Sequence, residues 1–125
     1  MRKADRGFSI PDRMRSFGYA AKGLAFMLRT QHNARLHLAA TATVLAVGLG
    51  LHVSPGDWKW LTVAIALVWV AEAFNTAFEH LCDVVSPQFH PAVEKAKDVG
   101  AAAVLICAAA ATALGALTLW PYLWK

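Results

Sequence analysis

The longest signals in the sequence are three apolar runs, which cover residues 36–53, 58–78 and 99–119. A helix rises 1.5 Å per residue, so about 20 residues cross the ~30 Å hydrocarbon core of a bilayer. The second and third runs reach this length, and the first is slightly short. The segment Ser54-Pro55-Gly56-Asp57, which is typical of a tight turn, separates the first two runs. The pattern therefore predicts three transmembrane helices.

Residues 13–30, ahead of the first run, follow the period of an amphipathic helix. Its apolar and basic faces are separate, as is typical of a helix that lies in the membrane interface. A soluble helix that packs on a partner is the alternative. We expect residues 1–11 to form a flexible basic tail and residues 1–125 to form one domain. The apolar face carries Met14, Phe17, Ala21, Leu24 and Leu28, and the basic face carries Arg15, Lys22 and Arg29.

The composition favours a membrane protein over other classes. Hydrophobic residues make up 58% of the chain, charged residues make up 16%, and the mean hydropathy is +0.44. A soluble chain of 125 residues needs more charged groups to cover its surface. A disordered chain is excluded, because disordered segments are poor in apolar residues. We expect an all-α membrane protein with an N-terminal amphipathic surface helix and three transmembrane helices.

Basic residues are concentrated near the N-terminus. Residues 1–35 hold eight basic and two acidic side chains, whereas residues 36–125 hold four and six. Because the basic segment directly precedes an apolar run, the positive-inside rule explains it more simply than nucleic-acid binding. The N-terminus is then cytoplasmic, and three spans place the C-terminus outside. The aromatic residues of the outer interface would be Trp58, Trp60, Trp120, Tyr122 and Trp124.

The second apolar run carries carboxylates, although charged groups within a membrane span are costly. Glu72 lies inside the run, and Glu79 and Asp83 follow it. At 100° per residue, Asn75, Thr76, Glu79 and Asp83 all lie within about 60° of Glu72 on one helix face. A solvated helix end would account for Asp83. It accounts poorly for Glu72, which lies about 10 Å deeper by helical rise, so we interpret Glu72 and Glu79 as functional.

The predicted topology gathers most of the remaining polar groups at the cytoplasmic leaflet. Carboxylates there can hold the metal of a Mg-nucleotide, and a lysine can meet its phosphates. A deeper carboxylate can accept a proton from a hydroxyl held at the membrane surface. The residues alone thus indicate a nucleotide or cation site, with no phosphate-binding glycine loop of a soluble nucleotide-binding fold. The gathered groups are Gln31, Asn33, Arg35, His37, the stripe from Glu72 to Asp83, Lys95, Lys97 and Asp98.

Two segments of the chain resemble a known family. The stretch AEAFNTAFEHLCDVVSPQFHP, followed by KAKDVGAAAVLI, is similar to the signature of the bacterial integral-membrane diacylglycerol kinases, which include the undecaprenol kinases. The upstream segments SFGYAAKGL and NARLH also resemble this family. The resemblance covers about residues 13–115. It implies a homotrimer with active sites formed between subunits at the cytoplasmic face of the bacterial inner membrane. It also implies transfer of the γ-phosphoryl group of Mg-ATP to a membrane lipid alcohol.

The resemblance also assigns roles to individual residues. Glu72 resembles the catalytic base, and Glu79 resembles the ligand of the ATP-bound Mg²⁺. Where members commonly carry a second metal-ligating glutamate, this chain has Gln31, which offers a carbonyl oxygen without a charge. The residues expected to bind ATP are Tyr19, Gln31, Asn75, Glu79, Gln88, His90, Lys97 and Asp98, with Lys97 on phosphate. The residues expected to contact the lipid substrate are Arg13, Asn33 and Arg35.

The identity of the lipid and a rival function stay open at this stage. Residues 33–37 and 86–91 look closer to the undecaprenol kinases than to the diacylglycerol kinases. The rival class is a small proton-coupled membrane transporter that uses Glu72, since an intramembrane glutamate is also a feature of such exporters. The position of Glu72 toward one leaflet, the lack of a fourth span and the Lys97-Asp98 pair count against a transporter.

Overall fold

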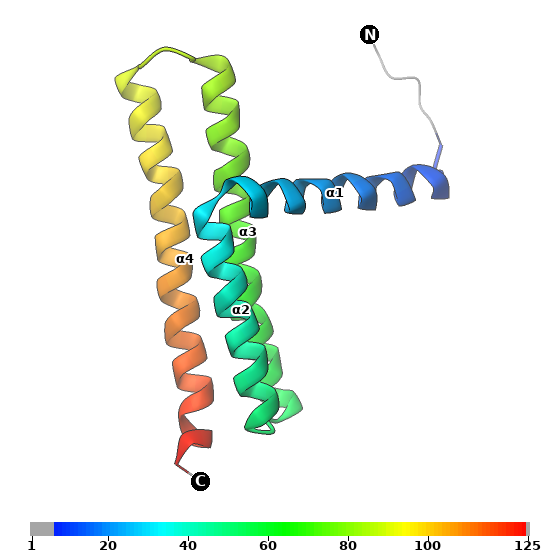
Figure 1. The fold of residues 1–125 in the computed structure, drawn as a ribbon, viewed down its shortest axis with the longest axis vertical. Coiled ribbons are helices and arrows are strands. Elements are labelled where there is room, and N and C mark those ends of the chain that lie inside the picture. The colour runs from blue at the N-terminus through cyan, green and yellow to red at the C-terminus, as the bar shows by residue number, and fades with distance from the viewer. Residues whose placement is uncertain (1–6, 125) are drawn as a thin grey trace.

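Residues 7–124 of the protein form four helices joined by short connections. The computed structural model describes residues 7–124, and it contains no strand within them. The helices are α1 (Ile10–Thr30), α2 (His32–Gly50), α3 (Pro55–Val85) and α4 (Pro91–Leu123). Figure 1 shows α2, α3 and α4 running along one another, with α1 projecting nearly at right angles from the top of α2. The prediction of an all-helical protein is confirmed.

Helix α1 begins three residues earlier than the pattern of apolar positions predicts. The side chain of Ser9 accepts a hydrogen bond from the Asp12 backbone N–H, and Pro11 occupies the first turn. Both are features of a helix N-terminus. The predicted flexible tail is therefore wrong for residues 10 and 11, which are helical, and its first six residues lie outside the described part of the chain.

The turn between α2 and α3 also lies earlier than predicted. Ser54 caps α3 by accepting a hydrogen bond from the Asp57 backbone N–H at 3.2 Å, and Pro55 is the first helical residue. The chain instead reverses at residues 51–54, where His52 has a φ of 52°. The segment that reads as a turn is thus mainly the capped start of a helix.

Helices α3 and α4 form the most extensive helix–helix contact and extend beyond the predicted spans at the end where residues 86–90 connect them. Both are long and apolar enough to cross a membrane, and most of each is exposed. Helix α2 does not reach the same mean hydropathy, because its first turns include His32, Asn33 and Arg35. The buried apolar core is small and centres on α3, at Leu61, Ala64 and Val68.

Hydrogen bonds join α3 and α4 at the end opposite to residues 86–90, which connect the two helices. The Ser54 backbone N–H donates to the Tyr122 hydroxyl at 3.0 Å, and the Tyr122 hydroxyl donates to the Asp57 carboxylate. These bonds join the C-terminal end of α4 to the start of α3. They fix the register of the two long helices, and with it the relative positions of the polar residues toward the other end, from Glu72 to Asp83 on α3 and at Lys97 and Asp98 on α4.

One glycine allows α2 to approach the start of α3. A Cβ atom at Gly48 would lie 2.7 Å from Cη2 of Trp58, whereas a Cβ at Gly50 would meet nothing within 4 Å.

We predict that Gly48→Ala lowers the free energy of unfolding by about 1–2 kcal/mol, because overpacking of about 1–3 kcal/mol exceeds the gain of about 1 kcal/mol in helix propensity. Gly50→Ala is the matched control and should not destabilise. Denaturant titration in detergent micelles measures both, and equal stabilities for the two variants would contradict the close packing.

Candidate active site

Glu72 is a buried carboxylate on α3, and His37 of α2 faces it. The Glu72 side chain is 2% exposed and that of His37 is 15% exposed. His37 Nε2 lies 3.8 Å from Glu72 Oε2, and neither atom has a hydrogen-bond partner among the described residues. A buried polar atom without a hydrogen-bond partner is costly, so Glu72 is unfavourable for the stability of the fold at this position.

The register of α2 against α3 brings His37 and Glu72 together. One turn further toward the α2–α3 connection, the Trp69 Nε1–H donates to the Thr41 hydroxyl at 2.9 Å. The Thr41 hydroxyl in turn donates to the His37 carbonyl oxygen at 2.7 Å. Since α2 and α3 are antiparallel, the contacts Thr41–Trp69 and His37–Glu72 follow one another along the same helix–helix interface. The Trp69–Thr41 bond therefore fixes the position of His37 relative to Glu72.

The next turns of α3 continue the polar stripe. The Asn75 side-chain amide donates to Glu79 Oε1 at 3.2 Å, while Asn75 Oδ1 and the Thr76 hydroxyl are buried without a partner. A Cβ atom at Gly100 of α4 would lie 2.5 Å from Asn75 Oδ1. The absence of a side chain at Gly100 is thus what leaves room for the Asn75 amide between α3 and α4. The predicted face of α3 is present, and its inner members are the buried ones.

A cavity of about 480 Å³ lies where α3 ends and α4 begins. Most of its polar lining comes from residues that the sequence analysis assigns to ATP. A volume of this size falls in the range of small-molecule sites. The predicted ATP-binding residues that line it are Glu79, Gln88, His90, Lys97 and Asp98.

Two residues of this cavity form an ion pair. Lys97 Nζ donates to Asp83 Oδ1 at 2.8 Å, and both side chains are partly exposed. They lie beyond the apolar stretches 58–78 and 99–119. The hydrogen bond from Lys97 and its charge hold the pKa of the Asp83 carboxyl below its ordinary value, and the same hydrogen bond raises the pKa of Lys97. Exposed pairs contribute about 0–1 kcal/mol, so a stronger anion can compete with Asp83 for Lys97.

Several predicted site residues lie away from the cavity or already have structural contacts. Arg35 donates to the carbonyl oxygens of Leu28 and Arg29, at 3.0 and 2.7 Å, and so caps the C-terminal end of α1. Gln31 is the half-buried residue between α1 and α2, and its backbone N–H donates to the Met27 carbonyl. The remaining three are exposed and do not line the cavity: Arg13 and Tyr19 on α1, and Asn33 on α2.

His90 has a local contact as well. Its Nδ1 atom accepts a hydrogen bond from the Ala92 backbone N–H at 3.2 Å, and His90 is therefore the N-cap of α4. Nδ1 is occupied by this bond, which leaves the opposite edge of the ring for a ligand. The prediction that His90 binds ATP rests only on the family resemblance.

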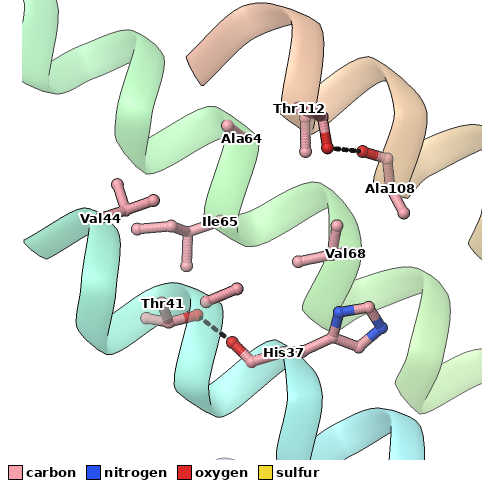
Figure 2. Close-up of a pocket in the computed structure, with 10 residues that line it drawn as sticks. His37, Thr41, Val44, Ala64, Ile65, Val68, Ala108 and Thr112 are labelled. Carbon is pink, nitrogen blue, oxygen red and sulfur yellow. Dashed lines mark hydrogen bonds between the residues drawn. The ribbon is translucent and has the colours of Figure 1, made fainter. Parts of the chain in front are cut away.

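A second, mainly apolar cavity of about 160 Å³ begins at His37 and runs between α2, α3 and α4. Figure 2 shows the His37 side chain extending from α2 toward α3, with Val68, Ile65 and Val44 further along. The polar cavity near residues 86–90 and this apolar one lie on either side of Glu72 along α3. The arrangement can hold a charged group on one side of Glu72 and an apolar one on the other.

No group of three or more His, Cys, Asp or Glu side chains within residues 7–124 is placed to hold a metal ion. Magnesium bound to a nucleotide needs less, because it commonly takes one or two carboxylates together with phosphate oxygens and waters. Glu79 lines the polar cavity, and its Oε1 receives only the amide of Asn75. One carboxylate at the cavity wall fits a magnesium ion that arrives with ATP better than a resident ion held by protein alone.

Sequence reasoning assigned no role to three residues that the structure places at this site: His37, Asp83 and Gly100. The sequence places His37 and Asp83 among the polar groups of the predicted cytoplasmic leaflet, but only the helix register shows which residues they face. An ionisable residue inside the first apolar run, opposite Glu72 in the second, is the signal that could have found His37. Gly100 lies within the segment KAKDVGAAAVLI that resembles the family, but only the structure shows that it faces Asn75.

The chain is similar to known proteins over most of its length. The profile of the family described as prokaryotic diacylglycerol kinase matches residues 18–119. An undecaprenol kinase of Bacillus subtilis is 33% identical over 109 residues, which cover 87% of this chain and 89% of that protein. A diacylglycerol kinase of Synechocystis is 34% identical over 112 residues, covering 89% of this chain and 64% of that protein.

A diacylglycerol kinase of Escherichia coli strain K12 is 28% identical over 109 residues, covering 87% of this chain and 89% of that protein. The matched region contains the whole polar stripe of α3 and both sides of the polar cavity. The resemblance inferred from the sequence motifs is confirmed, and so is the class of enzyme. The chain belongs to the prokaryotic diacylglycerol kinase family of lipid kinases.

Proposed function

We propose that this protein transfers the γ-phosphoryl group of Mg-ATP to the hydroxyl of a membrane lipid alcohol. The observation that carries the proposal is the position of Glu72, buried on α3 about two helical turns from the Glu79 carboxylate at the wall of the polar cavity. The cavity supplies a lysine and carboxylates for a nucleotide. The buried carboxylate supplies a base at the depth where a lipid hydroxyl arrives. The relatives named as undecaprenol and diacylglycerol kinases support this activity.

The proposed chemical step is a direct transfer. The lipid hydroxyl oxygen forms a bond to the γ-phosphorus, the bond from that phosphorus to the β,γ-bridging oxygen breaks, and ADP leaves. Glu72 takes the hydroxyl proton as the new bond forms, which is the role of a general base. Transfer of this kind depends mainly on positioning and on stabilisation of the phosphoryl oxygens. Asn75 and Gly100 contribute by setting where Glu79 lies relative to Glu72.

Lys97 is the proposed phosphate contact. It is held by Asp83 over the polar cavity, so its ammonium is already directed there before a nucleotide binds. A triphosphate carries more charge than one carboxylate and can displace or share this partner. Asp98, Gln88 and His90 line the same cavity and are proposed to surround the nucleotide. Tyr19 is proposed to reach it from α1.

Glu79 and the side-chain carbonyl of Gln31 are the proposed ligands of the magnesium ion. The bound ion would neutralise charge on the β- and γ-phosphates of ATP. Because Gln31 brings no charge, the protein's part of the metal site depends mainly on Glu79. Arg13, Asn33 and Arg35 are proposed to lie along the path of the lipid, with Arg35 acting through its cap on α1.

The proposed setting is the bacterial cytoplasmic membrane, with the N-terminus and the site on the cytoplasmic side. Helices α2, α3 and α4 would cross the bilayer, and α1 would lie on its surface. The geometry of Figure 1 supports this arrangement, since α1 projects across the direction of the other three helices. Its large apolar side chains Met14, Phe17 and Leu24 are exposed. A homotrimer with shared active sites would cover part of the apolar surface left on α3 and α4.

Two lipid alcohols are candidate substrates, diacylglycerol and undecaprenol. The likeness of residues 33–37 and 86–91 to the undecaprenol kinases favours undecaprenol. A proton-coupled transporter, the rival class from the sequence, has no support among the relatives.

The proposal is tested by following the label from [γ-³²P]ATP into extracted lipid with protein reconstituted in vesicles. We expect label in a lipid phosphate when undecaprenol or diacylglycerol is supplied, and none when magnesium is removed. The ratio of kcat/KM for the two lipids identifies the preferred substrate. Absence of label with every primary lipid alcohol, in protein that is folded and binds ATP, would contradict a lipid kinase.

The base is tested by Glu72→Gln, which keeps the shape of the side chain and loses its basic oxygen. We expect kcat to fall by about two to four orders of magnitude, the usual contribution of a general base. The Kd for ATP should change little, because Glu72 lies outside the polar cavity. The matched control is Asp12→Asn, which removes a partly exposed carboxylate on α1 outside that cavity and should retain near-parental kcat. A Glu72→Gln protein with normal turnover would place the base elsewhere.

The metal ligands are tested by the dependence of rate on free Mg²⁺. We expect Gln31→Glu to lower the magnesium concentration for half-maximal rate, because it adds a second carboxylate. Glu79→Gln should nearly abolish activity, since it removes the carboxylate on which the metal depends. An unchanged curve for Gln31→Glu together with an active Glu79→Gln protein would show that the metal is held by other groups.

A further inference from the structure

The contact between His37 and Glu72 is not explained by packing alone. The Glu72 side chain is buried and that of His37 is half-buried, and the buried atoms His37 Nε2 and Glu72 Oε2 lie 3.8 Å apart. Neither atom has a hydrogen-bond partner among the described residues. Unpartnered buried polar atoms are rare in proteins because each is costly. Two such atoms directed at one another attract when the imidazole is protonated and the carboxylate is ionised, and opposite charges at this distance offset part of the cost of burial.

The surroundings of Glu72 supply no other compensation. Its ion pair with His37 is the one that the structure contains for Glu72 within residues 7–124. The nearest carboxylate along the same helix face is Glu79, and its charge opposes a second negative charge at Glu72. Lys97 of α4 pairs with Asp83 and not with Glu72. Glu72 therefore depends on His37 if it is to carry the negative charge that a base requires.

We propose that His37 is a positioning residue of the phosphoryl transfer: its protonated imidazole keeps Glu72 ionised and oriented toward the lipid hydroxyl. The inference rests on the proposed function of Glu72 as the base. His37 itself is held by the Thr41–Trp69 hydrogen bonds that join α2 to α3. It lies at the mouth of the apolar cavity between α2, α3 and α4, beside the space that an apolar chain next to a hydroxyl could occupy.

The kinetic test compares His37→Gln, which removes the charge, with His37→Lys, which restores a cation of different shape. We expect His37→Gln to lower kcat by about 10- to 100-fold, as for other losses of positioning, and to leave the KM for ATP near the parental value. His37→Lys should recover part of the lost kcat. The matched control is His52→Asn at the opposite end of α2, because asparagine accepts the positive φ of that position. The control should keep parental kcat.

The charge of Glu72 is tested without turnover by infrared spectroscopy at pH 7. The carbonyl band of protonated Glu72 is identified in His37→Gln by its loss in the double variant His37→Gln/Glu72→Gln. We expect this band in His37→Gln and not in the parent or in His52→Asn. A parental kcat in His37→Gln, or the same band in parent and His37→Gln, would overturn the inference. So would equal losses in His37→Gln and His37→Lys, since shape and not charge would then matter.

The two tests separate this inference from the proposed function. If the parent transfers no phosphate to any lipid, the proposed function fails, and the infrared comparison still decides whether His37 controls the charge of Glu72. If the parent is active and His37→Gln is indistinguishable from it in both tests, the inference alone fails.

Discussion

The arrangement of this protein depends on keeping one carboxylate buried inside a helix that is otherwise apolar. Glu72 is almost fully covered, and a charge in such surroundings is unfavourable unless an opposite charge is close. Helix α2 supplies His37 for this purpose, and its register on α3 is fixed one turn away by Thr41 and Trp69. The polar stripe of α3 and the polar cavity then follow Glu72 along the same helix, on the side away from Thr41 and Trp69.

The two ends of the α3–α4 hairpin have different tasks. At one end, Tyr122, Ser54 and Asp57 join the helices through hydrogen bonds and set their register. At the other end, the helices extend beyond their apolar stretches and surround a polar cavity with Glu79 and Lys97 at its wall. The hydrogen-bonded end of the hairpin thus sets how the two helices meet at the polar cavity. There, weak surface pairs such as Lys97–Asp83 can exchange partners with a ligand.

Much of the fold could be predicted because helical period and apolar length are local properties. The stripe from Glu72 to Asp83 follows from residue spacing, and the structure buries its inner members Glu72 and Asn75. The contact between His37 and Glu72 could not be predicted, because it depends on the register of α2 against α3. Nor could the starts of α1 and α3, where capping by Ser9 and Ser54 outweighs the apolar pattern.

The central claim is that Glu72 lies at the meeting point of a nucleotide and a lipid hydroxyl. The most direct measurement is a structure with Mg²⁺, a non-hydrolysable ATP analogue and a lipid alcohol bound together. The account predicts the terminal phosphate beside Lys97 and Glu79, with the lipid hydroxyl within hydrogen-bond distance of the Glu72 carboxylate. A nucleotide bound away from the α3–α4 cavity, or a lipid hydroxyl that contacts a carboxylate other than Glu72, would contradict it.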